Sequence, residues 1–216
     1  MPETPHILVE SLTVGAFANN CYIVHSGEGS ECLLIDASAP ASAMIGRVRE
    51  LGLRPTRILL THAHIDHILG LAALRGAFPG VPVALHEAEH GWLDNPVLNL
   101  SAAMGEPFTA DAADETLGDG QEIEFAGERI RVLHTPGHSP GGVTFVIDCI
   151  DTAIVGDTLF ANSIGRFDFP TSDGPTLMAS IRERLYTLPD RTRVLPGHGP
   201  ETTIAREKRS NPYVRA

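Results

Sequence analysis

Apolar and polar positions in the first third of the chain alternate in strand-like runs before they give way to one helical pattern. Such runs cover residues 7–14, 21–24 and 32–35, with turn-forming residues between the last two, and predict an opening antiparallel meander. In residues 40–52 the apolar positions recur at helical spacing, which predicts a helix with one face on a core. The apolar run 57–60 then predicts a buried strand.

The second half of the chain repeats this order of strands followed by a helix. Strand-like runs cover residues 121–125, 128–134, 142–147 and 152–155, and residues 176–188 place leucine and isoleucine at helical spacing. Two sets of strands, each followed by a helix, predict two sheets packed face to face with helices on the outer surfaces. The expected fold class is therefore α/β (α+β).

Residues 95–120 carry no sustained period and form the longest irregular stretch of the sequence. They follow a predicted short strand at 81–85 and a predicted short helix at 86–94. Loops of this length in a compact domain are usually functional or mobile. Two interpretations remain open for this insertion: a partial lid with an apolar inner side, or surface filler with a few anchoring residues.

Length and composition are those of an ordinary globular protein. The 216 residues allow one large domain or two small ones, and 43% hydrophobic with 20% charged residues argues against a disordered chain. The formal net charge of -11 argues against a nucleic-acid partner, because phosphate binding requires an excess of lysine and arginine on one face. An anionic substrate would need a local basic patch on this chain.

The sequence carries no sign of secretion or of a membrane partner. Residues 1–6 lack the basic and apolar regions of a secretory signal, and no apolar run approaches the length of a membrane span. Cys21, Cys32 and Cys149 are odd in number and show no C-x-x-C spacing, so they are predicted to be reduced and to act as small hydrophobes. We therefore expect a cytoplasmic protein.

The densest cluster of chemically active side chains directly follows the buried strand predicted to end at residue 60. It contains His62, His64, Asp66 and His67, and the first two, at i and i+2, point to the same side in an extended or turning segment. Zinc and similar borderline metals take imidazole and carboxylate ligands, so four such groups can begin two metal sites. The alternative is a histidine-rich loop without a ligand role, but alternating histidine and aspartate serve no packing purpose.

Two later segments, residues 135–142 and 195–200, share the tripeptide Pro-Gly-His, and each follows a strand-like run. Proline and glycine turn the chain sharply and would present His138 and His198 at a sheet edge. Either histidine alone fits a hydrogen-bonded turn residue, whereas the repetition favours a ligand role. Between them an apolar strand ends in Asp157, whose carboxylate could bridge two cations.

With these residues in order, preceded by Asp36 after the third predicted strand, the chain resembles the metallo-β-lactamase fold superfamily over nearly its whole length. The resemblance implies a single domain over residues 1–216, built as a four-layer αββα sandwich of two mixed β-sheets with helices on both outer faces. It also implies two divalent metal ions, with zinc expected first and iron or manganese as alternatives. The implied ligand sets are His62, His64 and His138 for one metal, Asp66, His67 and His198 for the other, and Asp157 for both.

Differences between branches of the superfamily narrow the implied activity. True lactamases place a cysteine or serine where this chain has Asp157, and nucleic-acid-processing members carry a large additional domain for which 216 residues leave no space. The segments 156–160, 163–170 and 197–200 resemble the short, single-domain branch of glyoxalase II-like (hydroxyacylglutathione) hydrolases. Longer members of that group bind glutathione with a helical C-terminal domain that this sequence lacks.

This branch implies a metallo-hydrolase of small S-acyl thioesters such as S-lactoylglutathione, acting by attack of a metal-bound hydroxide at a dinuclear site. Asp66 would also serve as a catalytic residue by orienting the hydroxide. Arg166, in a glycine-rich segment shortly after Asp157, is the expected substrate-binding cation. Asp36 and His134 are expected to support the ligands from outside, with a buried hydrogen-bonded turn as an equal interpretation of each.

Two other functions remain open. Persulfide dioxygenases share the Gly-Arg-x-Asp-Phe segment at residues 165–169 and hold one iron with two histidines and an aspartate, here His62, His138 and Asp157. The Gly-Pro pair after His198 resembles the hydrolases more closely. A non-catalytic metal-binding protein is disfavoured because every ligand position is filled. The sequence predicts no particular oligomeric state.

Overall fold

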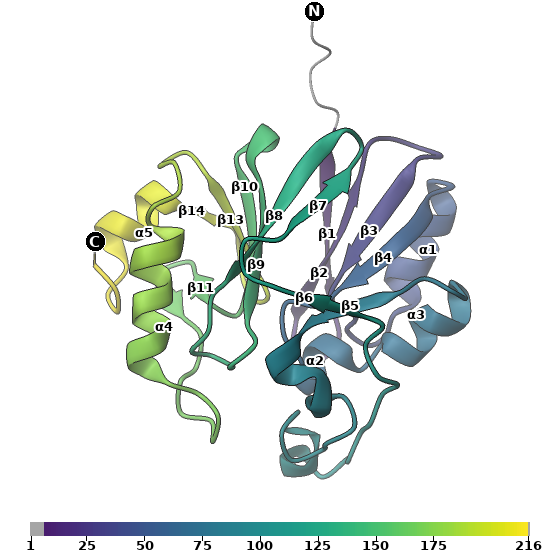
Figure 1. Cartoon of the computed structure of the whole chain (residues 1–216), viewed down its shortest axis with the longest axis horizontal. Helices are drawn as coiled ribbons and strands as arrows, with labels where there is room; N and C mark the ends of the chain where they lie inside the picture. The colour runs from purple at the N-terminus through teal and green to yellow at the C-terminus, as the bar shows by residue number, and fades with distance from the viewer. Residues whose placement is uncertain (1–6, 216) are drawn as a thin grey trace, which may run out of the picture.

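Two six-stranded β-sheets lie face to face in the computed structural model, which describes residues 7–215 (Figure 1). A separate two-stranded hairpin, β11 and β12, lies beside them. The expectation that the N-terminus carries no secretory signal concerns residues 1–6, which lie outside the described residues. Within residues 7–215 no helix is both long and apolar enough to cross a membrane.

The first sheet begins with the predicted antiparallel meander and continues with parallel strands. Strands β1, β2 and β3 pair antiparallel in sequence order, and β3, β4, β5 and β6 then pair in parallel. Mixed pairing is therefore confirmed for this sheet. Its strands are β1 (Leu8–Val14), β2 (Asn19–His25), β3 (Glu31–Ile35), β4 (Arg54–Leu59), β5 (Val83–His86) and β6 (Glu115–Leu117).

The second sheet has the order β14-β13-β10-β9-β8-β7 and is mixed as well, because β10 and β13 run parallel while the other neighbours run antiparallel. Its strands are β7 (Glu122–Phe125), β8 (Glu128–His134), β9 (Val143–Ile147), β10 (Thr152–Gly156), β13 (Arg193–Pro196) and β14 (Thr202–Thr203). The hairpin between β10 and β13 consists of β11 (Leu159–Phe160) and β12 (Ser163–Ile164).

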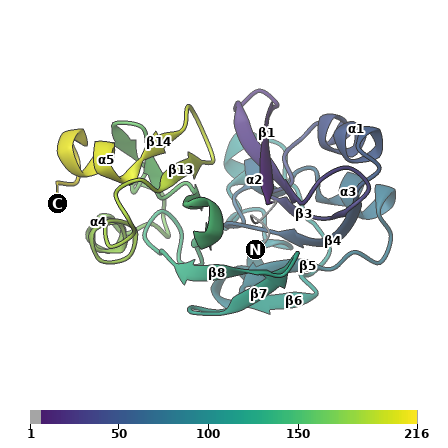
Figure 2. The same ribbon diagram turned by 90° about the horizontal axis from the view of Figure 1, so that it is seen from above.

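Helices cover the outer face of each sheet. Viewed as in Figure 2, α1 and α3 lie on one side of the molecule and α4 and α5 on the other. The first group comprises α1 (Ser42–Glu50), α2 (Ile65–Ile68), α3 (Leu71–Ala77) and the 3₁₀ turns η1 (Glu87–Trp92) and η2 (Ser101–Met104). The second comprises α4 (Gly174–Ser180), the π-helical turn η4 (Ile181–Leu185) and α5 (Ile204–Ser210), whereas the 3₁₀ turn η3 (Asp148–Ile150) packs against the core between the sheets.

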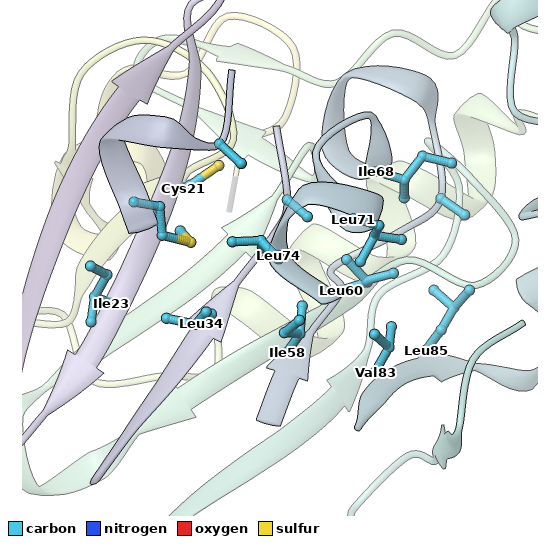
Figure 3. Packing of buried hydrophobic residues seen from close by; sticks show 14 of the residues in the cluster. Cys21, Ile23, Leu34, Ile58, Leu60, Ile68, Leu71, Leu74, Val83 and Leu85 are labelled. Carbon is cyan, nitrogen blue, oxygen red and sulfur yellow. The ribbon is translucent and has the colours of Figure 1, made fainter. Parts of the chain in front are cut away.

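Side chains alternate between the two faces of each strand and so form three separate hydrophobic cores, one between the sheets and one under the helices of each sheet. This confirms the predicted αββα order of layers. In β3, Cys32 and Leu34 face the helices of the first sheet, whereas Leu33 and Ile35 face the second sheet. Figure 3 shows the first of these cores, where Leu34 packs in the same cluster as Leu74 of α3. Burying a leucine or isoleucine fully contributes about 1.5–3 kcal/mol. The third core fills the space between the second sheet and its helices.

A glycine contact and a short edge strand account for two details of the fold. Residues 65–77 form two short helices, α2 and α3, separated at Gly70, which packs directly against the main-chain oxygens of Ala37 and Ser38, where a Cβ would collide. The irregular insertion contains η2 and the short edge strand β6, which is too brief for an alternating pattern to reveal.

The cysteines behave as predicted within the described residues. Cys21 and Cys32 are buried, Cys149 is partly buried, and all three are free thiols. Burial raises the pKa of the Cys32 thiol to about 12, so this side chain is an inert, neutral hydrophobe.

Candidate metal centre

The seven predicted ligands converge where the ends of strands from both sheets meet. His62 and His64 follow β4, Asp66 and His67 lie on α2, His138 lies between β8 and β9, Asp157 directly follows β10, and His198 follows β13. Main-chain hydrogen bonds close this seam, from the Val143 amide to the Thr61 carbonyl (2.9 Å) and from the Asn20 amide to the Gly197 carbonyl (2.7 Å). The centre therefore depends on both sheets.

The ligand atoms form three overlapping groups, each with all its members within 4.8 Å of one another. Two of these groups are the predicted sets of three, and the third shows that Asp157 shares a space with residues from both. The groups are His62, His64 and His138; Asp66, His67 and His198; and His62, His67 and Asp157.

Hydrogen bonds outside the centre orient the rings of the three-histidine group. His138 Nδ1 donates to the Arg166 carbonyl (2.8 Å), which can only accept, so Nε2 of the neutral ring keeps its lone pair. Thr61 Oγ1 donates to the Asp36 carboxylate and therefore accepts from His62 Nδ1 (3.1 Å). Both rings thus turn an unprotonated Nε2 away from their supporting partner, as metal-binding histidines do.

Unpartnered donor atoms show that this group fits a cation. His62 Nε2 is buried and has no hydrogen-bond partner within residues 7–215. His64 Nδ1 lies 2.9 Å from His138 Nε2, so two ring nitrogens face each other at hydrogen-bond distance. Because His138 Nε2 carries a lone pair, the close approach needs a proton or a cation between the rings. Nitrogen donors in this arrangement suit zinc, iron or manganese.

The second group mixes imidazoles with carboxylates. Asp66 Oδ2 lies 3.0 Å from His198 Nε2 and 3.6 Å from His67 Nε2. His198 Nδ1 donates to the Phe17 carbonyl (3.0 Å) and His67 Nδ1 to Asp36 Oδ2 (2.8 Å), so both rings are again held from outside. The group offers two ring nitrogens and one carboxylate oxygen to a common point.

Asp157 lies between the two groups. Its Oδ2 is 3.6 Å from His138 Nε2 and 3.5 Å from His198 Nε2, and its Oδ1 is 3.5 Å from His67 Nε2. Oδ1 is buried without a hydrogen-bond partner in the described part of the chain. Gly197 also permits this packing, since a Cβ at that position would collide with Asp157 Oδ1. Asp157 therefore lies close to residues of both groups.

The charges of the two groups differ. Burial lowers the pKa of His62 and of His138, and burial together with repulsion from His138 lowers the pKa of His64 to about 3. Burial also opposes the charged form of His67, but the carboxylates of Asp66, Asp36 and Asp157 outweigh it and raise its pKa well above the usual value. The three-histidine group is therefore neutral near pH 7, whereas the second group is ionised.

The carboxylates stay ionised despite their burial. For both Asp66 and Asp157 burial raises the pKa, but the neighbouring His67 and other histidines outweigh it, and the net pKa is lowered. Ionised carboxylates and neutral imidazoles are the forms that ligate divalent cations. The residues present thus fit two metal ions in donor type and orientation, and the second group fits in protonation as well once a cation displaces the proton held by His67.

Of the two predicted supporting residues, only Asp36 contacts the ligands. Its carboxylate accepts hydrogen bonds from His67 Nδ1 and from the main-chain amide of Thr61 (2.8 Å each). The His134 ring instead stacks on His86, with centroids 4.2 Å apart, and its Nε2 donates to the Pro140 carbonyl (2.8 Å). Within the described chain its side chain forms no hydrogen bond with any of the seven residues. His134 is the partly buried last residue of β8, so the expected buried turn does not describe it either.

Two further residues hold the ligands or their loops in place and were not predicted from the sequence. Glu89 of η1 is fully buried, and its carboxylate accepts from the amides of Ala63 (2.6 Å) and Gly141 (2.7 Å), which lie in the two loops that carry His64 and His138. Asn19 at the start of β2 contacts His67 Nε2 through its amide (2.9 Å). No sequence signal marks Glu89, because the charged segment around it has the composition of a solvated helix face.

A cavity of about 290 Å³ opens over the centre. Its wall includes Leu100 and Met104 from the irregular insertion, which supports the interpretation of that insertion as a partial lid. Leu98 and Phe108 of the same insertion pack against the first core and anchor it, so part of the filler interpretation also holds. The cavity is lined by Phe17, His64, Ile65, Asp66, Leu100, Met104, His138, Asp157, Phe160, Arg166, Phe169 and His198.

Arg166 lies at the mouth of this cavity, as a substrate-binding role requires. Its side chain is 66% exposed and forms two hydrogen bonds with Asp168 (2.9 and 2.8 Å). The guanidinium also lies over the ring of Phe169, 4.3 Å from its centroid. The cation is therefore positioned by its own segment, and its charge is partly balanced in this structure.

Curated relatives match the chain over most of its length. A Bacillus subtilis protein named "Probable metallo-hydrolase YqgX" is 40% identical over 205 residues, covering 94% of this chain and 95% of the relative. The "Hydroxyacylglutathione hydrolase GloC" of Haemophilus influenzae is 35% identical over 210 residues, covering 96% and 98%.

Solved structures show the same architecture. The BLEG-1 B3 metallo-beta-lactamase superposes with a TM-score of 0.91 at 38% identity, covering 97% of this chain and all of the other. The di-iron-bound form of TTHA1623 superposes with a TM-score of 0.84 at 38% identity, covering 95% of this chain and 100% of the other. A sequence profile described as "Metallo-beta-lactamase superfamily" matches residues 14–198. The chain belongs to the metallo-beta-lactamase superfamily.

Proposed function

We propose that this protein is a dinuclear metallo-hydrolase of S-acyl thioesters such as S-lactoylglutathione. The observation that carries the proposal is the convergence of seven predicted ligands around buried, unpartnered donor atoms at the floor of one cavity. Relatives described as a metallo-hydrolase and a hydroxyacylglutathione hydrolase support the reaction class and the thioester, respectively.

The proposal assigns the metals to the two groups of ligands. Bound there, divalent cations lower the pKa of a water molecule to about 7 and polarise a carbonyl oxygen. The structure of TTHA1623 contains two irons, which supports a dinuclear centre without choosing between zinc and iron for this chain. One cation would be held by His62, His64 and His138, the other by Asp66, His67 and His198, and both by Asp157.

Hydrolysis converts the thioester and one water into a carboxylic acid and a thiol. The water oxygen bonds to the acyl carbon, the carbon–sulfur bond breaks, and the sulfur leaves with the bonding electrons and takes up the released proton. Asp66 lies at the cavity floor and is ionised, so it can accept a hydrogen bond from the attacking water and orient it. A thiol with a pKa of about 8.5 leaves readily as a thiolate, so no strong general acid is needed.

Arg166 is proposed to bind an anionic part of the thiol carrier at the cavity mouth. Its ion pair with Asp168 joins two largely exposed groups, and such pairs contribute little to stability. A substrate carboxylate can therefore replace Asp168 at small cost, with the same two-bond geometry. This exchange would supply the local positive charge that a chain of net charge -11 otherwise lacks.

One preparation tests the proposal. The metals per chain are counted, hydrolysis of S-lactoylglutathione is followed, and oxygen uptake is recorded with glutathione persulfide as substrate. Two metals and thioester hydrolysis are expected. One iron with oxygen consumption and no thioesterase activity would replace the hydrolase by a mononuclear dioxygenase. Bound metal with neither activity would favour a non-catalytic metal-binding protein.

β-Lactam hydrolysis is a second candidate because the BLEG-1 structure, described as a B3 metallo-beta-lactamase, is 38% identical to this chain. That similarity weakens the sequence argument in which Asp157 disfavours lactamases. A chromogenic cephalosporin assayed in the same preparation distinguishes the two reactions. Turnover of the cephalosporin with a higher kcat/KM than any thioester would replace the thioesterase assignment.

A further inference from the structure

Two large apolar side chains are half exposed at the rim of the cavity. Phe17, in the turn between β1 and β2, and Met104, at the end of η2, are each 49% exposed, and both line the cavity. Apolar groups that gather on the surface of a soluble protein mark a place where a ligand or partner binds. These two residues are far apart in the sequence, and both line this cavity.

The apolar surface continues inward to the candidate ligands. The Phe169 ring lies 5.3 Å from the His64 ring and 5.8 Å from the His138 ring, measured between centroids, in edge-to-face arrangements. Phe160 approaches His198 in the same way at 6.2 Å. Aromatic rings therefore lie beside three of the candidate ligands that line the cavity.

Within residues 7–215, every polar side chain that lines the cavity already has another assigned role. Among the described residues that line the cavity, every polar side chain is either a candidate metal ligand or Arg166. No serine, threonine, asparagine, glutamine or tyrosine of the described chain contributes to it. Because these groups are assigned to the metals or to the thiol carrier, a hydroxylated acyl group would lose hydrogen bonds to water on entry and gain no dedicated partner in return.

The size of the cavity decides which part of the substrate it encloses. About 290 Å³ lies just below the roughly 300–1,000 Å³ of small-molecule sites, so a charged tripeptide carrier and its acyl group do not both fit inside. The carbonyl must reach the floor, so the acyl chain is the part that contacts the wall. The carrier then extends past the exposed Arg166 into solvent.

We infer that the acyl group of the preferred substrate is an unsubstituted alkyl chain, held against Phe17, Met104, Phe160 and Phe169, which all line the cavity. The inference rests on the proposed thioesterase function and narrows its substrate class. It places S-butyryl and S-hexanoyl thioesters ahead of the hydroxylated S-lactoyl thioester.

The test compares kcat/KM for the S-acetyl, S-butyryl, S-hexanoyl and S-lactoyl thioesters of glutathione. Burial of each methylene is expected to raise kcat/KM about threefold to fourfold, until the chain outgrows the cavity. A flat series, or a maximum at S-lactoylglutathione, overturns the inference and leaves the thioesterase in place.

A binding measurement separates failure of the inference from failure of the proposed function. S-Hexylglutathione and S-methylglutathione are thioethers that cannot be hydrolysed, and their dissociation constants are compared by calorimetry on the metal-loaded protein. S-Hexylglutathione is expected to bind at least tenfold more tightly. If it does while no thioester is hydrolysed, the apolar site stands and the reaction assignment fails. Equal affinities overturn the inference whatever the activity.

Variants of the wall connect the preference to these residues. Met104→Ser and Phe17→Ser are each expected to reduce the hexyl-to-methyl affinity ratio severalfold. The Phe17 carbonyl that accepts from His198 belongs to the main chain and is retained in the variant. Val97→Ser is the matched control, because Val97 lies in the same insertion and is 72% exposed but does not line the cavity. A ratio that falls equally in the control refutes the assignment of the wall.

Discussion

The two halves of the metal centre differ in the charge of their ligands: one consists of neutral histidines, and the other of charged groups. The three-histidine half consists of neutral rings whose pKa values burial lowers, and it needs no proton loss before it binds a cation. The half formed by Asp66, His67 and His198 is ionised, and neighbouring carboxylates raise the pKa of His67. A cation that enters there must displace a proton, so affinity for that half is expected to rise with pH while the other half changes little.

The halves are also supported from different places. Glu89 bridges the loops of the three-histidine half through two main-chain amides, and in the described part of the chain it forms no hydrogen bond with a ligand of the other half. Asp36 binds His67 directly and reaches His62 only through Thr61. One half is thus stabilised by a carboxylate that joins two loops, whereas the other is stabilised by hydrogen bonds to individual histidine rings. Substitutions at shared, separate and supporting positions can test this division.

Asp157 lies between the two halves, so its loss should have the largest effect on metal content and activity. Asp157→Ala is expected to weaken both metals and to lower kcat/KM by more than the roughly 100-fold that loss of an outer supporting partner costs. Metal content by elemental analysis and thioesterase kinetics measure the two effects. Asp148→Asn, an exposed carboxylate paired with Arg131, is the control. Retention of two metals in Asp157→Ala would contradict the bridging position.

His138 belongs to one half, so its loss should affect one metal. His138→Ala is expected to bring the metal content from two per chain to one, with the fold retained, because the second group keeps all its members. Elemental analysis gives the content, and circular dichroism checks the fold. An unchanged content of two would show that His138 is not a ligand, and a content of zero would show that the halves cannot load separately.

Asp36 supports both halves unequally. Asp36→Asn removes the charge that holds His67 Nδ1 and one of the partners of Thr61, so metal affinity is expected to fall about 10- to 100-fold at the second half. The three-histidine half should lose less, because its link to Asp36 passes through the Thr61 hydroxyl. Stepwise titration of the metal-free protein with cobalt, followed by its visible absorption, resolves the two affinities. Equal losses at both halves would argue against the direct role at His67.

Substitution of Glu89 should have the smallest and most selective effect on metal affinity. In Glu89→Gln an amide group faces one of the two main-chain donors, so the link between the loops is lost on one side. Cobalt affinity of the three-histidine half is expected to fall about tenfold, with the second half unchanged. Glu87→Gln on the same 3₁₀ turn is the matched control, since Glu87 is exposed. A loss of affinity confined to the second half would reverse the division of support.

The alternation of apolar and polar residues in the sequence predicted most of the strands that carry this site. The alternation in β3 and β4 marks which residues face a core, and the ends of these strands mark where His62 and Asp36 must lie. Pro-Gly-His at two strand ends and an aspartate at a third identify chemistry that has no packing purpose. The ligand residues could therefore be named before the fold was known, because strand period and turn chemistry are local properties.

Only the tertiary structure determined which residues surround those ligands. Glu89 was indistinguishable from a residue of a solvated helix, and His134 was expected beside the ligands but stacks on His86; both places depend on how β8 and the loops after β4 and β8 approach η1 and β5. The apolar wall unites Phe17 and Met104, which are far apart in the chain. Such neighbours arise from sheet packing and loop closure, and no repeat or spacing in the chain records them. The amino-acid pattern thus determined the reactive groups, and long-range packing determined what supports them and what they are able to bind.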